Sequence, residues 1–167
     1  MDAPPKYSRP EFERRFHVVA EHLPILDQAG ARLIEDRYID GTRLRLRRMS
    51  GGGRETLFKL TRKYGGPRPE PITTLFLEEG EYDLLSQLPA APLVKHRHHL
   101  PVGDHRFAVD VFAGAMAGLV LCEIETDSAE ALASIILPDW AGAEVTDDPA
   151  FAGAALARAI EPPDFRR

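Results

Sequence analysis

Two pairs of glutamates near opposite ends of the chain constrain its fold more than any other feature. Glu11 and Glu13 occur in the segment EFERRF, and Glu123 and Glu125 occur in LVLCEIE. Residues two apart in a β-strand project to the same face of the sheet. Carboxylates held so close together repel one another unless a cation lies between them, and oxygen donors of this kind suit Mg²⁺ or Mn²⁺. The pairs therefore predict two strands that share an acidic face.

Basic residues follow the same two-residue period between the acidic pairs. The alternating members are Arg43, Arg45, Arg47, Lys59, Lys63, Lys95 and Arg97. A surface selected only for solubility would mix the signs of charge within a strand, whereas here acids and bases occupy different strands. We interpret the pattern as a site for a metal-chelated polyanion, enclosed if the sheet closes into a tunnel. The pattern alone leaves a second interpretation open, the solvated face of a half-buried sheet.

Composition limits the classes of protein to consider. A chain of 167 residues is long enough for one domain with a sizeable core, and we expect a single domain over 1–167 with a flexible leader at 1–10. The net charge of −5 argues against a general nucleic-acid-binding protein. The single Cys122 excludes an internal disulfide and fits a reducing compartment. Without a membrane-spanning run or the apolar core of a signal peptide, a cytoplasmic protein is expected.

Periodicity and turn residues predict an α+β fold dominated by antiparallel strands. We expect strands at 11–19, 32–39, 42–49, 55–63, 72–77, 93–100, 106–112 and 119–126, and helices at 78–88, 128–136 and 150–160. Asp40-Gly41 is a strong hairpin signal between the second and third strands. About eight strands in one domain favour a closed barrel or a strongly curved sheet.

Seven segments, in order along the chain, resemble motifs of the CYTH domain of the triphosphate tunnel metalloenzyme superfamily. EFERRF resembles the opening Glu-x-Glu-x-Lys strand, and RYIDGTRLRLRR resembles the second and third strands. LTRK, KHRH, VDVFAG and LVLCEIE resemble later strands in turn, and WAGAEVTDD resembles the tail motif. The match extends from residue 11 to about residue 160 and looks most like the short bacterial tripolyphosphatase-like branch.

This resemblance implies an eight-stranded antiparallel β-tunnel with helices packed outside it, and metal-dependent hydrolysis of inorganic tripolyphosphate or a nucleoside triphosphate. By the resemblance, Mg²⁺ or Mn²⁺ would be held by Glu11, Glu13, Glu123, Glu125 and Asp110. Phosphate oxygens would be bound by Arg43, Arg45, Lys63, Lys95 and Arg97. Tyr38 and Arg15 would take the places of the catalytic Lys–Tyr dyad. The expected partner is therefore a small anionic triphosphate, not a membrane or a nucleic acid.

Departures from the family pattern keep alternatives open. Arg15 stands in place of a lysine, and a guanidinium stays charged where an amine could exchange its proton. Asp36 and Arg37 replace Gln-Gly, and Ile72 and Thr74 replace two acids of the fifth strand. A binding module for polyphosphate or a phosphorylated ligand, without hydrolysis, is the main alternative, and a class IV-type adenylate cyclase is a third. A homodimer is also left open.

Overall fold

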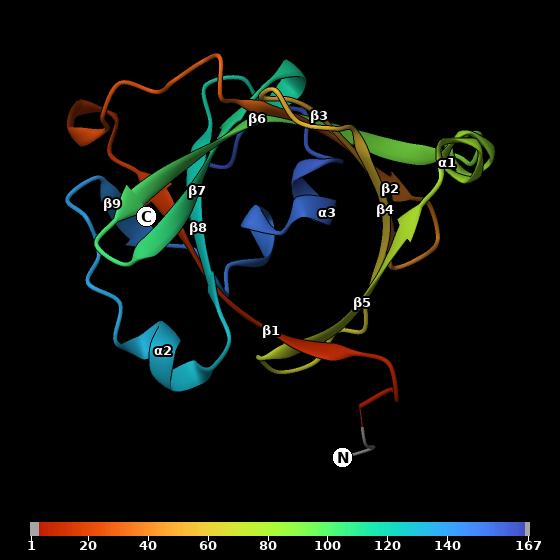
Figure 1. Ribbon diagram of the computed structural model, residues 1–167, viewed down its shortest axis with the longest axis horizontal. Coiled ribbons are helices and arrows are strands. Elements are labelled where there is room, and N and C mark those ends of the chain that lie inside the picture. The colour runs from red at the N-terminus through yellow and green to blue at the C-terminus, as the bar shows by residue number, and fades with distance from the viewer. Residues whose placement is uncertain (1–3, 166–167) are drawn as a thin grey trace.

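Strand pairing closes the chain into a barrel in the computed structural model, which describes residues 4–165 (Figure 1). The strands are β1 (Arg9–Val18), β2 (Arg32–Ile39), β3 (Leu44–Gly51), β4 (Leu57–Lys63), β5 (Glu70–Leu77), β6 (Ala90–Val102), β7 (His105–Phe112), β8 (Val120–Thr126) and β9 (Ala141–Glu144). Their order is β5-β4-β3-β2-β6-β7-β8-β1-β9, and β5 also pairs with β1. This last pairing closes an eight-stranded antiparallel barrel, with β9 alongside β1. The predicted fold class is confirmed.

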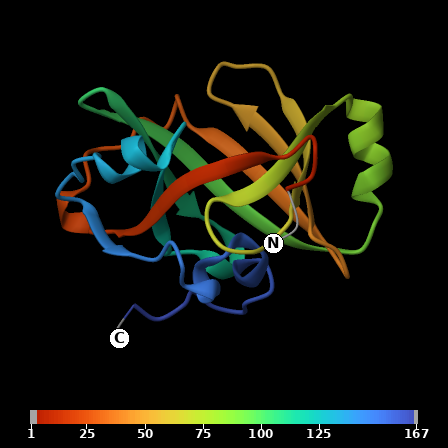
Figure 2. The same ribbon diagram turned by 90° about the horizontal axis from the view of Figure 1, so that it is seen from below.

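Short helices surround the barrel or close one end of it. The α-helices are α1 (Glu79–Ser86), α2 (Ala129–Ala133) and α3 (Gly153–Leu156), and the 3₁₀ turns are η1 (Ala20–His22), η2 (Gly114–Met116) and η3 (Pro149–Phe151). Figures 1 and 2 show α1 and α2 outside the barrel wall, and α3 beneath one end of it. No helix among the described residues is long and apolar enough to cross a membrane.

Strand bounds agree closely with the periodicity where turn residues are strong. β2 occupies the predicted 32–39, and the hairpin that follows it has Gly41 at φ 68°, a left-handed conformation that glycine adopts without steric cost. β3 and β4 each begin two residues later than expected, since the hairpin turn and the glycine-rich turn extend further. β1 already begins at Arg9, inside the predicted leader, because Arg9 pairs with Ile72 of β5; residues 1–3 lie outside the described residues.

Apolar side chains pack in two places, outside the barrel wall and at one of its ends. The outer cluster contains Phe16, Val18, Phe107, Val109, Cys122, Ile124, Ile135 and Trp140. The end cluster contains Leu93, Phe112, Met116, Leu119, Leu121, Val145, Phe151 and Leu156. The apolar faces of β1, β7 and β8 thus find partners outside the barrel, and this arrangement leaves their charged faces turned inward.

The C-terminal part differs most from the prediction. Instead of one helix over 150–160, the chain forms η3 and then the four-residue α3, separated at Ala152, which has extended backbone at φ −64° and ψ 137°. The break places Phe151 and Leu156 in the end cluster. The predicted helix 128–136 is likewise shorter, ending with α2 at Ala133. β9 was not predicted; it adds to β1 through Phe16 and Val18.

Candidate active site

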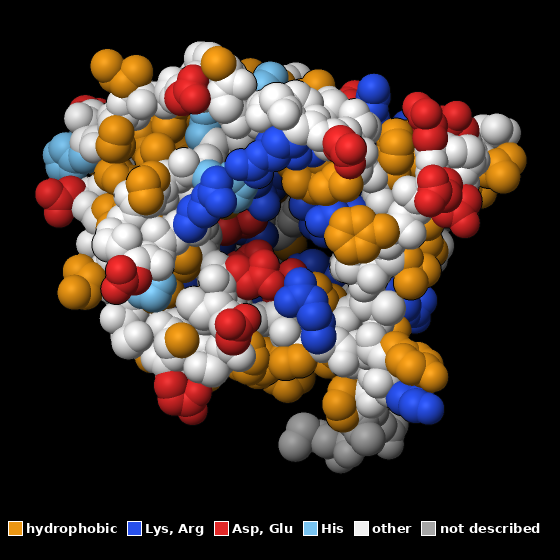
Figure 3. All heavy atoms as spheres, viewed as in Figure 1, with side chains coloured by type: hydrophobic (Ala, Val, Ile, Leu, Met, Phe, Trp, Pro, Cys, Tyr) orange, Lys and Arg blue, Asp and Glu red, His pale blue; other side chains and the backbone are white. Residues whose placement is uncertain are grey.

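A cavity of about 410 Å³ occupies the interior of the barrel. Its charged lining residues are Arg9, Glu11, Glu13, Arg15, Arg45, Arg47, Lys59, Lys63, Lys95, Arg97, Glu123 and Glu125. Figure 3 looks into the mouth of the barrel, where side chains of both signs surround a deep opening. The apolar floor comes from the end cluster, with Leu93, Phe112 and Leu156 in the lining.

The four predicted glutamates lie on two adjacent strands and form an acidic wall. β1 and β8 pair so that Glu13 lies opposite Glu125, and Arg15 opposite Glu123. Glu11 accepts a hydrogen bond from Lys63 Nζ at 2.5 Å, across the β1–β5 seam. Glu125 lies toward the mouth and is ion-paired with Arg9 at 3.0 Å. The structure therefore brings all four carboxylates to one side of the cavity.

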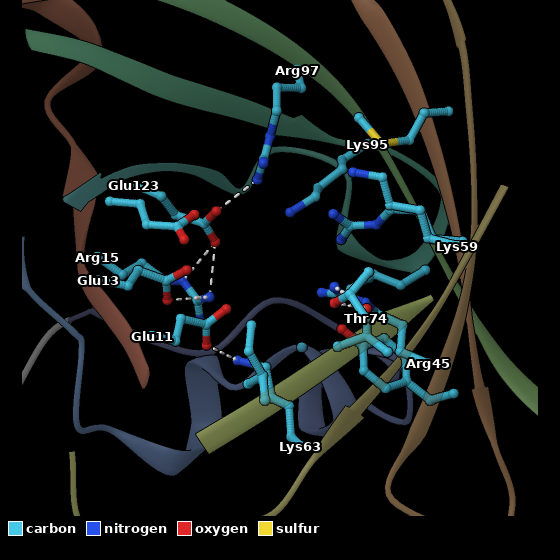
Figure 4. Close-up of a pocket in the computed structure, with 18 of the residues that line it drawn as sticks. Glu11, Glu13, Arg15, Arg45, Lys59, Lys63, Thr74, Lys95, Arg97 and Glu123 are labelled. Atoms are coloured by element: carbon cyan, nitrogen blue, oxygen red, sulfur yellow. Dashed lines mark hydrogen bonds and ion pairs between the residues drawn. The ribbon is translucent and has the colours of Figure 1, made fainter. Parts of the chain in front are cut away.

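Arg15 lies within the acidic wall and joins it to the closed end of the barrel. Its Nε donates to Glu123 Oε1 at 2.9 Å, and its Nη2 donates to Glu13 Oε1 at 3.1 Å (Figure 4). Its Nη1 donates to the carbonyl oxygen of Phe151 at 2.9 Å. Because a guanidinium does not lose its proton at physiological pH, Arg15 is a fixed counter-ion between two strands.

The pKa values of the glutamates show where negative charge is in excess. Burial, and next the neighbouring Glu123, raise the pKa of Glu13, and Glu11 adds to the effect against Arg15 and Lys63. Burial alone would also raise the pKa of Glu123, but Lys95, Arg15 and Arg97 hold it well below its ordinary range. Of these two buried carboxylates, Glu13 is therefore the one whose charged form is disfavoured.

Arginines and lysines of β3, β4 and β6 form a basic wall opposite the acids (Figure 4). Two buried aspartates form hydrogen-bonded ion pairs with several of these bases. Asp36 accepts two hydrogen bonds from Arg47, at 2.6 and 2.7 Å. Asp110 accepts two from Arg97, at 2.7 and 2.6 Å, and a further one from Lys95. These bidentate pairs fix the direction of each guanidinium.

Part of the basic wall has no close anionic partner among the described residues. Burial, and then the Arg47, Arg45 and Arg97 guanidinium groups, lower the pKa of Lys59. Arg45 Nε is buried and makes no hydrogen bond, since the nearest carboxylate oxygen, on Asp36, is 3.9 Å away. Unsatisfied buried donors of this kind are rare in folded proteins. They indicate a surface prepared for an anion.

The structure separates two predicted residues from the main cavity. Asp110 was predicted as a metal ligand, but it is fully buried beneath the side chains of the basic wall and is not in the cavity lining, with its oxygens bound to Lys95 and Arg97. It therefore positions bases. Arg43 was predicted to bind phosphate, but it precedes β3 and donates to the carbonyl oxygen of Tyr64, at a second cavity. The other ten predicted residues line the main cavity.

The family motifs did not include Arg47, Lys59 or Asp36 among the site residues. The two-residue period did place the first two in the alternating basic series. Asp36 gave no such signal, because its importance depends on the pairing of β2 with β3, which places it opposite Arg47. Ile72 and Thr74 line the cavity where the resemblance expects acids, and Thr74 shares a hydrogen bond of 3.0 Å with Thr61.

Tyr38 faces the cavity at its closed end. Burial, and then Asp36, raise the pKa of its phenol, which therefore stays protonated and able to donate a hydrogen bond. Gly153 of α3 packs so tightly against this phenol that a Cβ there would lie 1.9 Å from the hydroxyl oxygen. The start of α3 thus sets the position of Tyr38.

The acidic wall has the donors that a divalent cation needs, although they are not gathered around one point. Among residues 4–165, no group of three or more His, Cys, Asp or Glu side chains is already arranged to hold a metal ion. The oxygen donors and the raised pKa of Glu13 nevertheless fit an added cation, which would relieve the repulsion among Glu11, Glu13 and Glu123. The residues present are therefore compatible with Mg²⁺ or Mn²⁺.

Comparison with known proteins adds independent information. No protein-family model matches the chain. An inorganic triphosphatase from Nitrosomonas europaea is 44% identical over 61 residues, which span 36% of this chain and only 40% of that protein. A solved inorganic triphosphatase has a TM-score of 0.61 at 25% identity, covering 92% of this chain and 97% of the other. A solved structure from Bacillus halodurans, whose name proposes an adenylate cyclase, has a TM-score of 0.57 at 17% identity. The match covers 77% of this chain and 86% of the other.

The closed barrel and its oppositely charged inner walls define a charged β-tunnel, the architecture that the resemblance to the CYTH domain implies. The likeness to the inorganic triphosphatases, in sequence over one segment and in structure over nearly the whole chain, confirms the resemblance to the CYTH superfamily. The Bacillus structure supports the fold alone at its level of identity.

Proposed function

We propose that this protein hydrolyses a triphosphate inside the barrel with the help of a divalent metal. The observation that carries the proposal is the pair of oppositely charged walls that face each other across one cavity. Glu11, Glu13, Glu123 and Glu125 line one side, and the bases of β3, β4 and β6 line the other. A metal-chelated triphosphate would satisfy both walls, because its cation faces carboxylates and its phosphate oxygens face bases. Inorganic tripolyphosphate is the favoured substrate, since that activity is in the name of both similar triphosphatases.

The basic wall would bind and orient the phosphates. Arg45, with its free Nε, and Lys59 are the groups most in need of an anion, while Asp36 and Asp110 hold Arg47 and the β6 bases in place. Such preorganised charges stabilise the charge that develops on phosphate oxygens in the transition state. Water would then form a bond to the terminal phosphorus as the bridging P–O bond breaks, giving orthophosphate and pyrophosphate.

The acidic wall would hold the metal through Glu11, Glu13, Glu123 and Glu125. Bound there, Mg²⁺ or Mn²⁺ would polarise a phosphoryl oxygen and orient water. Arg15 cannot exchange protons as a lysine can, so we assign it to aligning Glu13 and Glu123. Tyr38 would donate a hydrogen bond toward the substrate from the closed end. Cytoplasmic location and assembly as a homodimer stay predictions from the sequence.

A second candidate is binding of the same ligands without hydrolysis. It is favoured by one observation: Ile72 and Thr74 line the cavity at positions where the family pattern has acids. Tight, salt-sensitive binding of tripolyphosphate without phosphate release would support this alternative. Rapid phosphate release would exclude it.

The double substitution Glu123→Gln and Glu125→Gln tests the proposed function. We expect it to reduce metal-dependent phosphate release from tripolyphosphate by at least about 100-fold, because the wall loses half of its carboxylates. The matched control is Glu21→Gln with Glu130→Gln, which removes two exposed charges far from the cavity. Phosphate release should be measured with Mg²⁺, Mn²⁺ or EDTA, and folding by thermal unfolding. Unchanged turnover in the folded double variant would contradict the proposal.

A further inference from the structure

A second cavity, of about 350 Å³, adjoins the first at the closed end of the barrel. Its lining residues come from the start of β3, the loop from β4 to β5, and the C-terminal segment that carries α3. Six residues line both cavities: Glu13, Arg15, Tyr38, Arg45, Lys63 and Gly153. The two spaces therefore share one set of side chains, and a ligand in one lies next to the other.

The lining of the second cavity is strongly cationic. Its charged members are Glu13, Arg15, Arg43, Arg45, Lys63, Arg68, Glu70 and Arg158. Bases thus outnumber acids by six to two in this lining, in a chain whose net charge is −5. Two of these bases have acidic partners outside the lining: Arg68 pairs with Asp147 and Arg158 with Asp40, each at 2.8 Å. A local field of this sign, opposite to that of the whole protein, attracts anions to the cavity.

Arg45 supplies an independent indication of a ligand. Its side chain lies where the two cavities meet, and its buried Nε has no hydrogen-bond partner. The carboxylate that could satisfy it, Asp36, is already occupied by Arg47. An anion that reaches the junction would provide the missing acceptor, since leaving a buried charged donor unsatisfied is costly.

Aromatic side chains distinguish what each cavity can accept. Tyr7 and Phe76 line the first cavity and are exposed. In the second cavity, Tyr38 is the only aromatic residue among the described lining residues. The phenol of Tyr38 is packed against Gly153, so its ring is not free to stack on a base. The second cavity therefore suits a chain of phosphates better than a nucleoside.

We propose that the second cavity is a phosphate subsite that receives the additional phosphates of a linear polyphosphate longer than three units. This inference rests on the proposed function, because it extends the triphosphate held in the first cavity past Arg45 and Lys63. Its volume, similar to that of the first cavity, leaves room for further phosphate groups. Three bases, Arg43, Arg68 and Arg158, line the second cavity and not the first. Arg68 and Arg158 would contact only the longer chain, exchanging their present partners Asp147 and Asp40 for phosphate oxygens.

Binding of two ligands of different length tests the proposal. Calorimetry should compare tripolyphosphate with a longer linear polyphosphate of defined length, in EDTA and in Mg²⁺, for the whole protein. A longer polyphosphate would bind more tightly in any case, because it can occupy the same site in more positions and carries more charge. The subsite is therefore tested by variants and not by the affinity of the unmodified protein. Arg158→Gln and, separately, Arg68→Gln should weaken binding of the longer chain by about 5- to 10-fold, roughly 1 kcal/mol, and change tripolyphosphate affinity by less than about twofold.

Arg62→Gln is the matched control for charge. Arg62 is exposed on β4, next to Lys63 in sequence, and lines neither cavity. It should leave the preference for the longer chain unchanged. Equal losses for both ligands, or a loss equal to that of Arg62→Gln, would overturn the subsite while the tripolyphosphate site stands. Failure of the unmodified protein to bind tripolyphosphate at all would overturn the proposed function, and this inference with it.

Discussion

Single buried aspartates determine the direction of the tunnel's positive charges. Asp36 is 2% exposed and holds Arg47, while Asp110 is fully buried and holds Arg97 and Lys95. Removing one partner of such a pair leaves the other charge buried and uncompensated, which costs more than the pair itself contributes. These aspartates therefore matter for both stability and ligand binding, although they do not reach the cavity.

The substitution Asp36→Asn should lower stability in a pH-dependent manner. Burial by itself would raise the pKa of Asp36, but Arg47 and Arg45 lower it from its ordinary 3.8 to about 2. A depressed folded-state pKa stabilises the protein above the unfolded value, and this contribution is lost as the pH falls through the folded value. At neutral pH we expect a loss of about 2 kcal/mol in the free energy of unfolding, shrinking between about pH 4 and pH 2.

Urea unfolding across this pH range measures the effect. Asp83→Asn is the control, because Asp83 is exposed on α1 and does not line the tunnel cavity. A stability difference between the parent and Asp36→Asn that stays constant down to pH 2 would contradict the account of this ion pair.

Individual residues also mark how far sequence could predict the site. The two-residue period identified the four glutamates, Arg45 and Lys95, since a strand places alternate side chains on one face whatever its partners are. Arg43 has the same period but lies one residue before β3, and it lines the second cavity instead of the first. The hydrogen bond from the Arg15 guanidinium to the carbonyl oxygen of Phe151 joins residues 136 positions apart, so no local sequence pattern could predict it.

At the scale of elements, the C-terminal segment determines the shape of the tunnel's closed end. Its alanine-rich sequence favours helix, yet packing divides it into η3 and α3. Phe151 and Leu156 then fill the end cluster, while the Phe151 carbonyl binds Arg15. Sequence could predict the helical tendency, but not the break, because tertiary contacts override propensity here.

The substitution Gly153→Ala should disturb this end of the tunnel. The new Cβ would lie 1.9 Å from the hydroxyl oxygen of Tyr38, so α3 or the phenol must move. We expect a loss of about 1–3 kcal/mol in the free energy of unfolding, as for overpacked cores, together with weaker tripolyphosphate binding. Thermal unfolding and calorimetry measure the two effects.

Gly80→Ala provides the matched control in α1. A Cβ there meets nothing within 4 Å, so the substitution should be neutral or stabilise by up to about 1 kcal/mol. If Gly153→Ala behaved in the same way as Gly80→Ala, the tight packing of α3 on Tyr38 would be refuted.

At the scale of the whole molecule, the barrel reverses the usual arrangement of a small β-protein. Its apolar strand faces pack outward, against α2, β9 and the segments around them, and its charged faces turn inward. Burying so many charges is costly unless they are paired or meet a ligand. The sequence indicated this arrangement through the sorting of acids and bases by strand. It could not indicate the second cavity, which forms only where the β4–β5 loop and the C-terminal segment meet.

The most direct test of the account is phosphate release from tripolyphosphate by the unmodified protein, with Mg²⁺, with Mn²⁺ and with EDTA. The account predicts release of orthophosphate and pyrophosphate in equal amounts with a divalent metal, and none above background with EDTA. Tripolyphosphate that binds in the tunnel but is not cleaved with either metal would contradict hydrolysis and establish binding alone. Cleavage that EDTA does not affect would contradict the role of the acidic wall.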